Sequence, residues 1–551
     1  MSAQILLQGK LLGSEDFLLS PPADRDNRAF EARSMWLALV GEAIPRALLA
    51  ELDLPPLLLG SSGSDRFLVI LPDQARADSA KAFLERASES LSAVTAGRMR
   101  LAWSATENLG DWTIVRKRLE EGMREHSCVG PSEPGFFEPF IPSGPGADRI
   151  PRDLRDAASV DWGFDIAALI RSAAKAPPPQ RSRAAQAAAI PVSAAPVNTV
   201  PAQDATEQDT TATQAAEDAE AVAVMTEEGA PSAPTTEEPA TAAEAVPVPQ
   251  VAAPHLTWEV GTDAALPVAR HAARSGESVA LPKDLARRAR GEKLWAVLRG
   301  EIDDFGTRMR RVQSVEEHVH LSMLYKQFLA GEIELLCSQG EYFQRVTVLY
   351  SGGADFALFG AWDSLAGFAR ELERVFARFA QEQLKDLPGA EAKTLTMALA
   401  IAEPGASLAR VYEDCGRDLA VARATDKDCF HMLGRVLEWK QLNDAAELKD
   451  AVVQINEEFR GGRQFLGQLR NLYKKVEGAS SSATPADEER LMARALRFQR
   501  RFAHVGNKRE REFQKLRSHL MKEMAGRRIK GRLRLRPEGL VALEWARLAE
   551  D

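Results

Sequence analysis

The stretch VTVLYSGGADFALFG, residues Val346–Gly360, decides the fold of the sequence around it. Two runs rich in apolar and β-branched residues flank a Gly-Gly pair, a pattern that predicts a β-hairpin with its turn at Gly352 and Gly353. The runs EKLWAVLRGEID (292–303) and KTLTMALAIA (393–402) predict two further strands. Helical spacing of apolar residues fills the intervals between them, so this part of the sequence predicts an α+β unit.

The first 150 residues follow the same order with a weaker pattern. ILLQGKLLG (5–13) predicts a strand, and PPLLLGSSGSDRFLVILP (55–72) predicts a hairpin around a Gly/Ser turn. Matching the two hairpins sets Ser62-Gly63-Ser64-Asp65 opposite Gly352-Gly353-Ala354-Asp355. We interpret this match as an internal duplication of one α/β unit, and a chance agreement between two unrelated units is the alternative.

An acidic segment separates the two units. Between Ala184 and His255 the sequence has no aromatic residue, no Lys and no Arg, but it has eleven Asp and Glu residues. The negative charge of these eleven acids is larger than the net charge of the whole chain, which is −9. Because such a segment cannot bury enough apolar surface to offset its chain entropy, residues 176–255 are predicted to form a disordered linker.

Cysteine usage and hydropathy indicate the compartment. The four cysteines contain no CxxC pair, which argues against a disulfide framework or a cysteine zinc ribbon and fits a reducing environment. The start of the chain lacks a secretory signal, and no apolar run approaches the ~20 residues that a spanning helix needs. The sequence therefore predicts a cytoplasmic protein with no membrane contact.

The C-terminal part is predicted to be helical and basic. Between Arg490 and Arg536 there are 17 Lys and Arg residues against three Glu, a charge suited to a phosphate backbone or an acidic partner. Few aromatic residues lie among them, so backbone contact is favoured over base stacking. A solvated helix face is the alternative interpretation.

Acidic residues at one strand end are the candidate residues for metal binding and catalysis. In WAVLRGEIDDFG the period of two puts Glu301 and Asp303 on one face of the strand, beside a hairpin whose turn reads Gly-Gly-x-Asp. Palm-type nucleotidyl transferases and cyclases hold divalent ions over a triphosphate in this way, because Mg²⁺ prefers oxygen ligands. Glycines allow the backbone to approach phosphates. The alternative is a plain turn with surface charges around it.

Residues 293–433 resemble the second palm domain of the large, Cas-ten-type subunit of type III CRISPR effector complexes, a relative of the GGDEF cyclases. The resemblance rests on these motifs: LRGEIDDFG, HLSMLYKQFLAGEIELLCS, YSGGADFALFGAWDSL, LTMALAIA and DLAVARATDKDCFHMLG. It implies an α+β fold with two ferredoxin-like palm domains and a helical C-terminal domain. The implied organisation is a degenerate first palm (1–150), a connecting segment (151–175), the acidic linker (176–255), the second palm (256–434) and the basic helical domain (435–551).

The resemblance also implies a function. Such a subunit works with other effector subunits, CRISPR guide RNA and target RNA, and its second palm converts ATP into cyclic oligoadenylates with Mg²⁺ or Mn²⁺. Carried over by motif, the implied catalytic residues are Asp303 and Asp355. The implied metal ligands are Glu301, Asp303, Asp304 and Asp355. The implied nucleotide-binding residues are Ser351, Gly352, Gly353, Arg423 and Lys427.

Departures from the family pattern bear on activity. Ala354 replaces the first Asp of the family's GGDD and removes an oxygen ligand, and Glu301 stands where the family usually has Asp. An inactive or weak cyclase is therefore the leading hypothesis. An active synthase of cyclic oligoadenylates, with Asp303, Asp304 and Asp355 still binding one metal ion, is the alternative. A signalling cyclase that uses GTP is a minor alternative.

Two modules often found in the family are not expected. None of the eight histidines is followed by Asp, so an HD nuclease is not predicted. The acidic linker occupies the interval where the family often has a cysteine zinc module.

Overall fold

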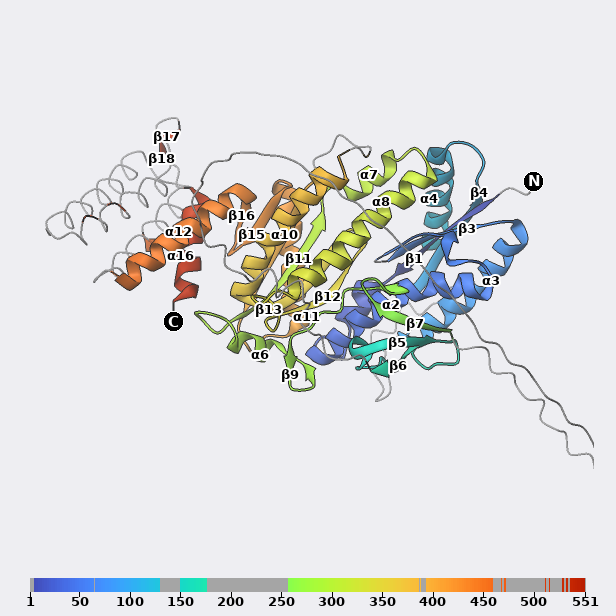
Figure 1. Ribbon diagram of the computed structural model, residues 1–551, viewed down its shortest axis with the longest axis horizontal. Coiled ribbons are helices and arrows are strands. Elements are labelled where there is room, and N and C mark those ends of the chain that lie inside the picture. Colours follow the sequence, from blue (N-terminus) through green and yellow to red (C-terminus); the bar gives the residue numbers. More distant parts are fainter. Residues whose placement is uncertain are drawn as a thin grey trace, which may run out of the picture. The chain divides into compact units, whose positions relative to one another are not determined.

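The computed structural model describes residues 4–63, 65–128, 149–175, 256–385, 387, 393–458 and 536–550, together with a few isolated residues between 467 and 533. The described residues belong to one compact unit (Figure 1). The predicted disordered linker and nearly all of the predicted basic segment lie outside the described residues.

A six-stranded sheet contains the hairpin that the sequence predicted. Its central strand is β11 (Trp295–Ile302), which pairs antiparallel with β13 on one side and with β14 on the other. The strand order is β12-β13-β11-β14-β15-β16, and the β14–β15 pair is the parallel one. The other strands are β12 (Val346–Gly352), β13 (Asp355–Ala361), β14 (Leu395–Ala402), β15 (Cys429–Met432) and β16 (Arg435–Glu438).

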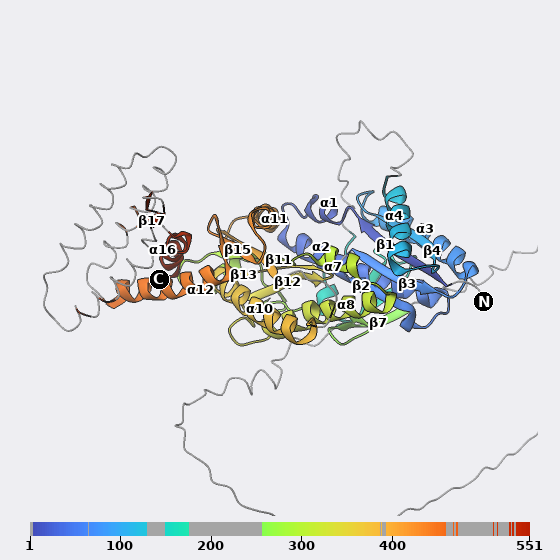
Figure 2. The same ribbon diagram turned by 90° about the horizontal axis from the view of Figure 1, so that it is seen from above.

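Both faces of this sheet are covered. Alternate residues of β11 enter two different cores: Ala296 and Leu298 pack with α8 and α10, and Trp295 and Val297 pack with α11. Figure 2 shows α11 on one side of the sheet and α8 and α10 on the other. The helical stretch that follows β11 and α7 is interrupted by a π-helical segment. The covering elements are α8 (Val315–Gln327), the π segment η3 (Phe328–Glu332), α9 (Ile333–Cys337), α10 (Trp362–Gln383) and α11 (Leu408–Thr425).

A four-stranded sheet near the N-terminus has the same topology. Its order is β2-β3-β1-β4, all antiparallel, which matches β12-β13-β11-β14 strand for strand. The shared order shows that the two units have the same topology, as the sequence indicated, and the internal duplication stays an interpretation. Its elements are β1 (Ile5–Leu12), α1 (Ser14–Leu19), α2 (Asn27–Glu51), β2 (Leu59–Gly63), β3 (Arg66–Leu71), α3 (Gln74–Val94), β4 (Arg100–Glu107) and α4 (Trp112–Cys128).

The pairing register corrects the match between the two hairpins by one residue. The last pair before the turn is Gly63–Arg66 in the first sheet and Gly352–Asp355 in the second. Arg66, and not Asp65, therefore corresponds to Asp355. Aligning the two turns by residue type was misleading, because cross-strand pairing and not the identity of the turn residues fixes hairpin register.

A third sheet joins the chain on both sides of the predicted linker. Strand β5 pairs with β6 and also with β7, where Val160 lies opposite Trp258. The sequence pattern did not predict this sheet. Its strands are β5 (Ala157–Trp162), β6 (Ile170–Lys175), β7 (Leu256–Gly261) and β8 (Leu266–Pro267). The two segments that flank residues 176–255 are thus held in one sheet.

Helices α12 (Trp439–Glu458) and α16 (Pro537–Ala549) pack together after the second sheet, in agreement with the predicted helical C-terminus. Residues 435–438, however, form the edge strand β16 of the second sheet rather than the start of a helix. The remaining elements are η1 (Pro56–Leu58), η2 (Leu154–Asp156), β9 (Arg274–Ser275), β10 (Ser278–Val279), α6 (Pro282–Arg287), α7 (Phe305–Arg311), β17 (Arg528–Ile529) and β18 (Arg532–Leu533).

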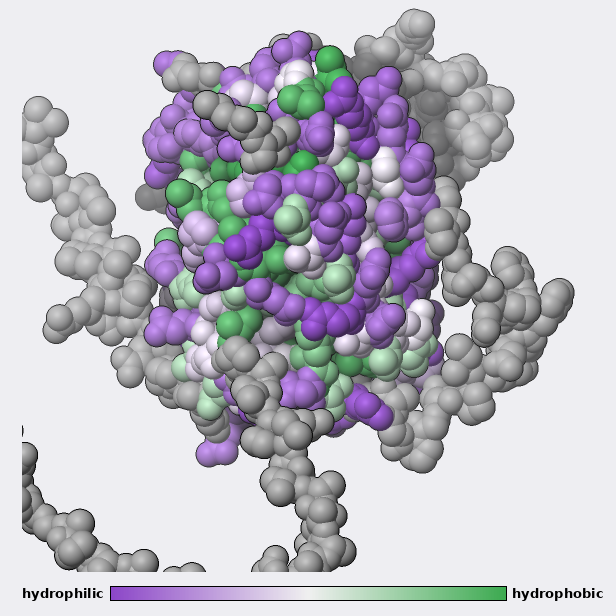
Figure 3. All heavy atoms as spheres, turned by 90° about the vertical axis from the view of Figure 1, so that its right-hand side faces the viewer, coloured by the Kyte–Doolittle hydropathy of each residue, from purple (hydrophilic) through white to green (hydrophobic). Residues whose placement is uncertain are grey.

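No helix in the described part of the chain combines the length and the apolar character needed to cross a bilayer. Hydrophilic residues cover most of the face in Figure 3, and hydrophobic residues occur between them in small groups. Scattered apolar residues of this kind are ordinary for a protein surface.

Gly300→Ala should destabilise the second sheet. A Cβ at this position would lie 2.3 Å from the buried Phe356 ring and 2.9 Å from Met397 Cγ. Overpacking of this kind costs about 1–3 kcal/mol, so the thermal unfolding midpoint should fall. Gly405→Ala is the matched control, because no atom lies within 4 Å of its added Cβ. Equal midpoints for the two variants would contradict the packing argument.

Candidate functional site

The turn of the second hairpin has two residues, Gly353 and Ala354, between the paired residues Gly352 and Asp355. Gly353 has φ +66°, a conformation that strains residues with a Cβ. The backbone N–H of Ile302 donates to the Ala354 carbonyl at 2.8 Å. The end of β11 thus fixes the position of the turn.

Glu301 lies directly opposite Asp355 in the β11–β13 ladder. Its carboxylate forms an ion pair with Arg423 at 2.6 Å. Burial, with Asp303 and Asp355 nearby, raises the pKa of Glu301 above its ordinary value, although Arg423 opposes the shift. Arg423, expected at the phosphates, therefore neutralises one of the expected metal ligands.

Asp303 follows the last residue of β11 and is 3% exposed. Its carboxylate accepts hydrogen bonds from the hydroxyls of Thr394 and Thr396, both at 2.7 Å, and from the backbone N–H of Asp428 at 3.0 Å. These bonds connect the ends of β11, β14 and β15. Asp303 thus has a structural role at the strand ends. Its expected roles in catalysis and metal binding stay predictions.

Asp304 caps α7 in the left-handed conformation with φ 55°. Its carboxylate forms an ion pair with Lys427 at 2.6 Å, and this hydrogen bond raises the pKa of Lys427. Helix α11 ends at Thr425, so Lys427 lies just beyond the helix. Both predicted phosphate-binding cations are therefore paired with carboxylates of the predicted metal site.

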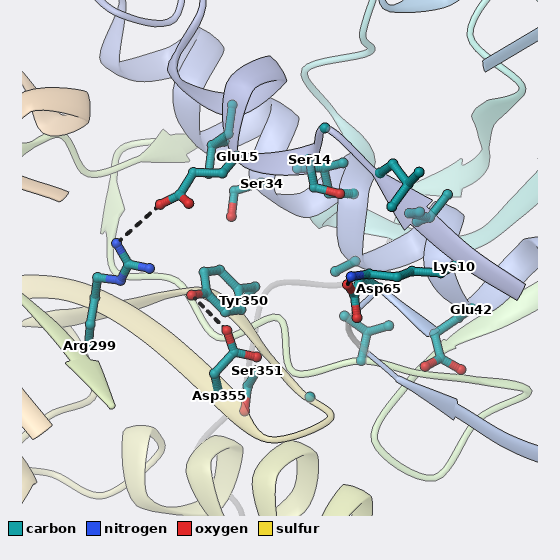
Figure 4. A pocket seen from close by; sticks show the side chains of 18 of the residues that line it. Lys10, Ser14, Glu15, Ser34, Glu42, Asp65, Arg299, Tyr350, Ser351 and Asp355 are labelled. Carbon is teal, nitrogen blue, oxygen red and sulfur yellow. Dashed lines mark hydrogen bonds and ion pairs between the residues drawn. The ribbon is translucent and has the colours of Figure 1, made fainter. Parts of the chain in front are cut away.

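Two tyrosines connect to Asp355: Tyr350 is half-buried and Tyr412 is buried. The Tyr350 hydroxyl donates to the Asp355 carboxylate at 3.4 Å, and the Tyr412 hydroxyl donates to that of Tyr350 at 3.3 Å. Burial raises the pKa of Tyr350 well above its ordinary value, so its proton stays available for donation. Arg299 stacks over the Tyr412 ring at 4.0 Å and pairs with Glu15 of the first unit (Figure 4). The sequence analysis did not single out either tyrosine.

Ser351 faces the interior of the second unit. Its hydroxyl donates to the Leu329 carbonyl at 2.5 Å, and Leu329 lies in the π-helical segment η3. A π-helical turn frees a carbonyl from the regular ladder and often occurs near functional sites. Ser351 therefore anchors the predicted nucleotide-binding turn to this segment.

The turns of the two hairpins meet. A Cβ added to Gly63 would lie 3.0 Å from the backbone nitrogen of Gly353. Two cavities border this contact, of about 460 Å³ and about 360 Å³, and both are lined by Asp65, Lys326 and Asp355. The candidate site is therefore a cleft that both palm units build.

The larger cavity has apolar and cationic walls. Trp112, Phe305 and Met309 line it together with Arg66 and the cationic or imidazole side chains Arg116, Arg310 and His318. Burial lowers the pKa of His318 to about 4, so this imidazole is neutral near pH 7.

A buried ion cluster joins the two units beside the turns. Lys326 of α8 contacts Glu42 of α2 at 2.5 Å and Ser62 of the first hairpin at 2.8 Å. Arg46 contacts Glu42 at 2.7 Å. Although burial opposes ionisation, these two cations hold the pKa of Glu42 below its ordinary value. The sequence signal was Lys326, the one Lys, Arg, Asp or Glu residue between His318 and Gly331.

The residues present do not fit a pair of divalent metal ions. Among the residues that the structure describes, no three His, Cys, Asp or Glu side chains gather closely enough to hold a metal ion. Ala354 contributes no oxygen ligand, and Asp303 is engaged by two hydroxyls and a backbone N–H. The metal set of Glu301, Asp303, Asp304 and Asp355 stays a prediction from the resemblance.

Glu301→Gln should stabilise the protein at high pH. Because the folded pKa of Glu301 is raised, its stabilising contribution is present below about pH 4.3 and is lost as the pH rises through the folded value. The variant should therefore exceed wild type in free energy of unfolding at pH 8 and match it near pH 4. Urea unfolding at both pH values measures this, with exposed Glu277→Gln as the control. A difference that is constant with pH would refute the prediction.

A family model described as Cas10/Cmr2, second palm domain, matches residues 294–431. The chain is also similar to the CRISPR system single-strand-specific deoxyribonuclease Cas10/Csm1 (subtype III-A) of Enterococcus italicus, with 24% identity over 192 residues. That match covers 33% of this chain and 24% of the relative, so it spans about a quarter of the relative's length.

Two solved structures have a similar fold. One is the Csm1–Csm4 cassette in complex with cA4, with a TM-score of 0.65 and 14% identity. The other is the cassette in complex with one ATP, with a TM-score of 0.62 and 15% identity. Each alignment covers 100% of this chain and 70% of the other. Residues 294–431 therefore match the second palm domain of the Cas10/Cmr2 family, within a fold similar to that of Csm1.

Proposed function

We propose that this chain is the large subunit of an RNA-guided type III CRISPR effector complex. The observation that carries the proposal is the family match at residues 294–431, within a likeness to Csm1 that extends over the whole chain. Its partners would be the other effector subunits, guide RNA and target RNA. The solved Csm1–Csm4 subcomplex of a type III-A interference complex supports this assignment by analogy.

The cleft between the hairpins is the proposed nucleotide site. Its larger cavity of about 460 Å³ is big enough for a nucleotide. Apolar Phe305 and Met309 offer contact to a base, and Arg66 and Arg310 offer charge to phosphates. ATP is the proposed nucleotide, because similar cassettes have been solved with ATP and with cA4.

The chemistry of this palm is proposed to be weak. Ala354 withholds one carboxylate, and the remaining acids are held by partners within the protein. Arg423 pairs with Glu301, and Lys427 pairs with Asp304. The subunit would then act chiefly as a scaffold and sensor of target RNA.

An active synthase of cyclic oligoadenylates is the second candidate function. The register favours it in one respect, because Glu301 and Asp355 stand opposite each other with two oxygens each. If this alternative holds, bound Mg²⁺ or Mn²⁺ would stabilise negative charge on the phosphates.

Assembly is the first test of the proposal. Co-expressed with the remaining subunits of a type III complex from the same source and with a guide RNA, the chain should elute with them as one particle in size-exclusion chromatography. Elution of the chain alone, with the other subunits assembled normally, would contradict the proposed role as a subunit.

ATP turnover is the second test. The assembled complex, with matching target RNA and ATP in Mg²⁺ or Mn²⁺, should yield little cyclic product, and Ala354→Asp should raise the yield about tenfold or more, equivalent to a barrier lower by at least ~1.4 kcal/mol. Adding Asp355→Ala to that variant should abolish the gain. Ample wild-type product that is lost on Asp355→Ala would instead establish the active synthase.

A further inference from the structure

The two hairpins carry a serine at the same register position. Ser62 pairs with Phe67 in the first hairpin, and Ser351 pairs with Phe356 in the second. The two phenylalanines correspond, because each also pairs with a glycine of the central strand whose added Cβ would strike the phenylalanine ring. Each serine stands one residue before the last pair of its hairpin. Ser62 and Ser351 are therefore equivalent residues of the two palm units.

One short helical stretch holds both serines. Lys326, in the last turn of α8, donates from its Nζ to the Ser62 hydroxyl oxygen at 2.8 Å. Three residues later, the Leu329 carbonyl in η3 accepts a hydrogen bond from the Ser351 hydroxyl at 2.5 Å. We call residues 326–329 the bridging stretch. Within about one helical turn, it connects equivalent positions of the two hairpins.

The packing of the helix agrees with these contacts. Helix α8 packs against β2 of the first hairpin, and η3 packs against β12 of the second. The approach to β2 is close, because a Cβ added to Gly60 would lie 3.3 Å from Val319 Cγ2. Between the two contacts the hydrogen bonding changes from α-helical to π-helical, a change that is frequent at functional sites. The bridging stretch therefore lies against both hairpins.

The contacts at both ends of the bridging stretch are shielded from water. Lys326 and Glu42 keep side-chain exposures of 14% and 6%, and the Ser62 hydroxyl donates to Glu42 at 2.9 Å. At the other end Leu329 is fully buried and Ser351 is 8% exposed. Because water does not replace a buried hydrogen bond that breaks, its loss is costly. A displacement of either hairpin should therefore displace the bridging stretch with it.

We propose that the bridging stretch couples the two hairpin turns, with Lys326 as a positioning residue of the cleft between them. The stretch transmits a displacement of one turn to the other through its bonds to Ser62 and Ser351. The coupling itself needs no ligand. Its effect on a bound nucleotide rests on the proposed function of the cleft, because both turns border the cavities proposed for that nucleotide.

The test is hydrogen–deuterium exchange, followed by mass spectrometry, of the purified full chain without nucleotide. Lys326→Met removes contacts to the first unit alone, but it should speed exchange about tenfold in both hairpins, residues 59–71 and 346–361. Ser351→Ala removes a bond of the second hairpin, and it should speed exchange in the first hairpin as well. Faster exchange only in the hairpin that loses its own contact would overturn the inference.

Arg155→Met is the matched control. It breaks a buried ion pair with Glu31, in which the side chains are 2% and 8% exposed, and neither residue belongs to a hairpin. This variant should lower the thermal unfolding midpoint without selectively speeding exchange in the hairpins. An equal effect on the hairpins would reduce the result to general destabilisation and contradict the proposal.

Ser351 also provides a milder pair of variants, which keeps the test decisive if Lys326→Met does not fold. Ser351→Ala removes one hydroxyl, whereas Ser351→Thr keeps it. The threonine variant should restore slow exchange in both hairpins. Fast exchange in the first hairpin of Ser351→Thr would show that the bond to Leu329 is not the cause.

A double variant separates the bridging stretch from the direct contact of the turns. Gly63 and Gly353 also lie close together, which gives the turns a second route of influence. If the bridging stretch is the route, release of one end already uncouples it. Lys326→Met combined with Ser351→Ala should then exchange no faster than the faster single variant. A rate increase equal to the product of the two single increases would show independent contacts and refute the proposal.

Addition of ATP separates this inference from the proposed function. If ATP slows exchange in the hairpins of wild type while the single variants affect only their own hairpin, the cleft binds nucleotide and the inference fails. If both single variants speed exchange in both hairpins but ATP protects neither, with or without Mg²⁺, the coupling holds and the proposed nucleotide site fails.

Discussion

The contact between two hairpin turns is the constraint on which the candidate site depends. Gly63 lies so close to the backbone of Gly353 that an added Cβ would be 3.0 Å from the Gly353 nitrogen, in tight contact with the second turn. Because the turns meet, Asp65 and Asp355, which are far apart in sequence, line the same two cavities. The ion cluster of Lys326 and Glu42 holds the units together beside that contact.

Charge balance explains why the carboxylates of the second palm are paired with groups of the protein itself. Four carboxylates at one strand end repel each other, and burial raises the cost of ionising Glu301 in particular. The protein offsets this repulsion with its own groups: Arg423 and Lys427 pair with two of the acids, and threonine hydroxyls bind Asp303. The first palm avoids the problem because Lys10 and Arg66 stand at the register positions of Glu301 and Asp355.

Local pattern predicted the elements near the site well. The Gly-Gly hairpin, the acidic strand before it and the duplicated strand order were all legible, because alternation and turn residues act over short distances. The one-residue error in matching Asp65 to Asp355 arose because hairpin register depends on pairing with β1 and β11, as the Gly9–Phe67 and Gly300–Phe356 pairs show. The sheet of β5–β8 escaped prediction because its strands are short and lie on opposite sides of a long insertion.

The sequence by itself determined the kind of fold, the absence of a carboxylate at Ala354 and the set of acids available around the second turn. Only the tertiary structure decided how those acids are used. It paired Arg423 with Glu301 and Lys427 with Asp304, buried Asp303 among hydroxyls, and connected Asp355 to Tyr350. The physical reason is that composition and periodicity fix local geometry, whereas the partner of a charged side chain depends on which distant segments fold against it.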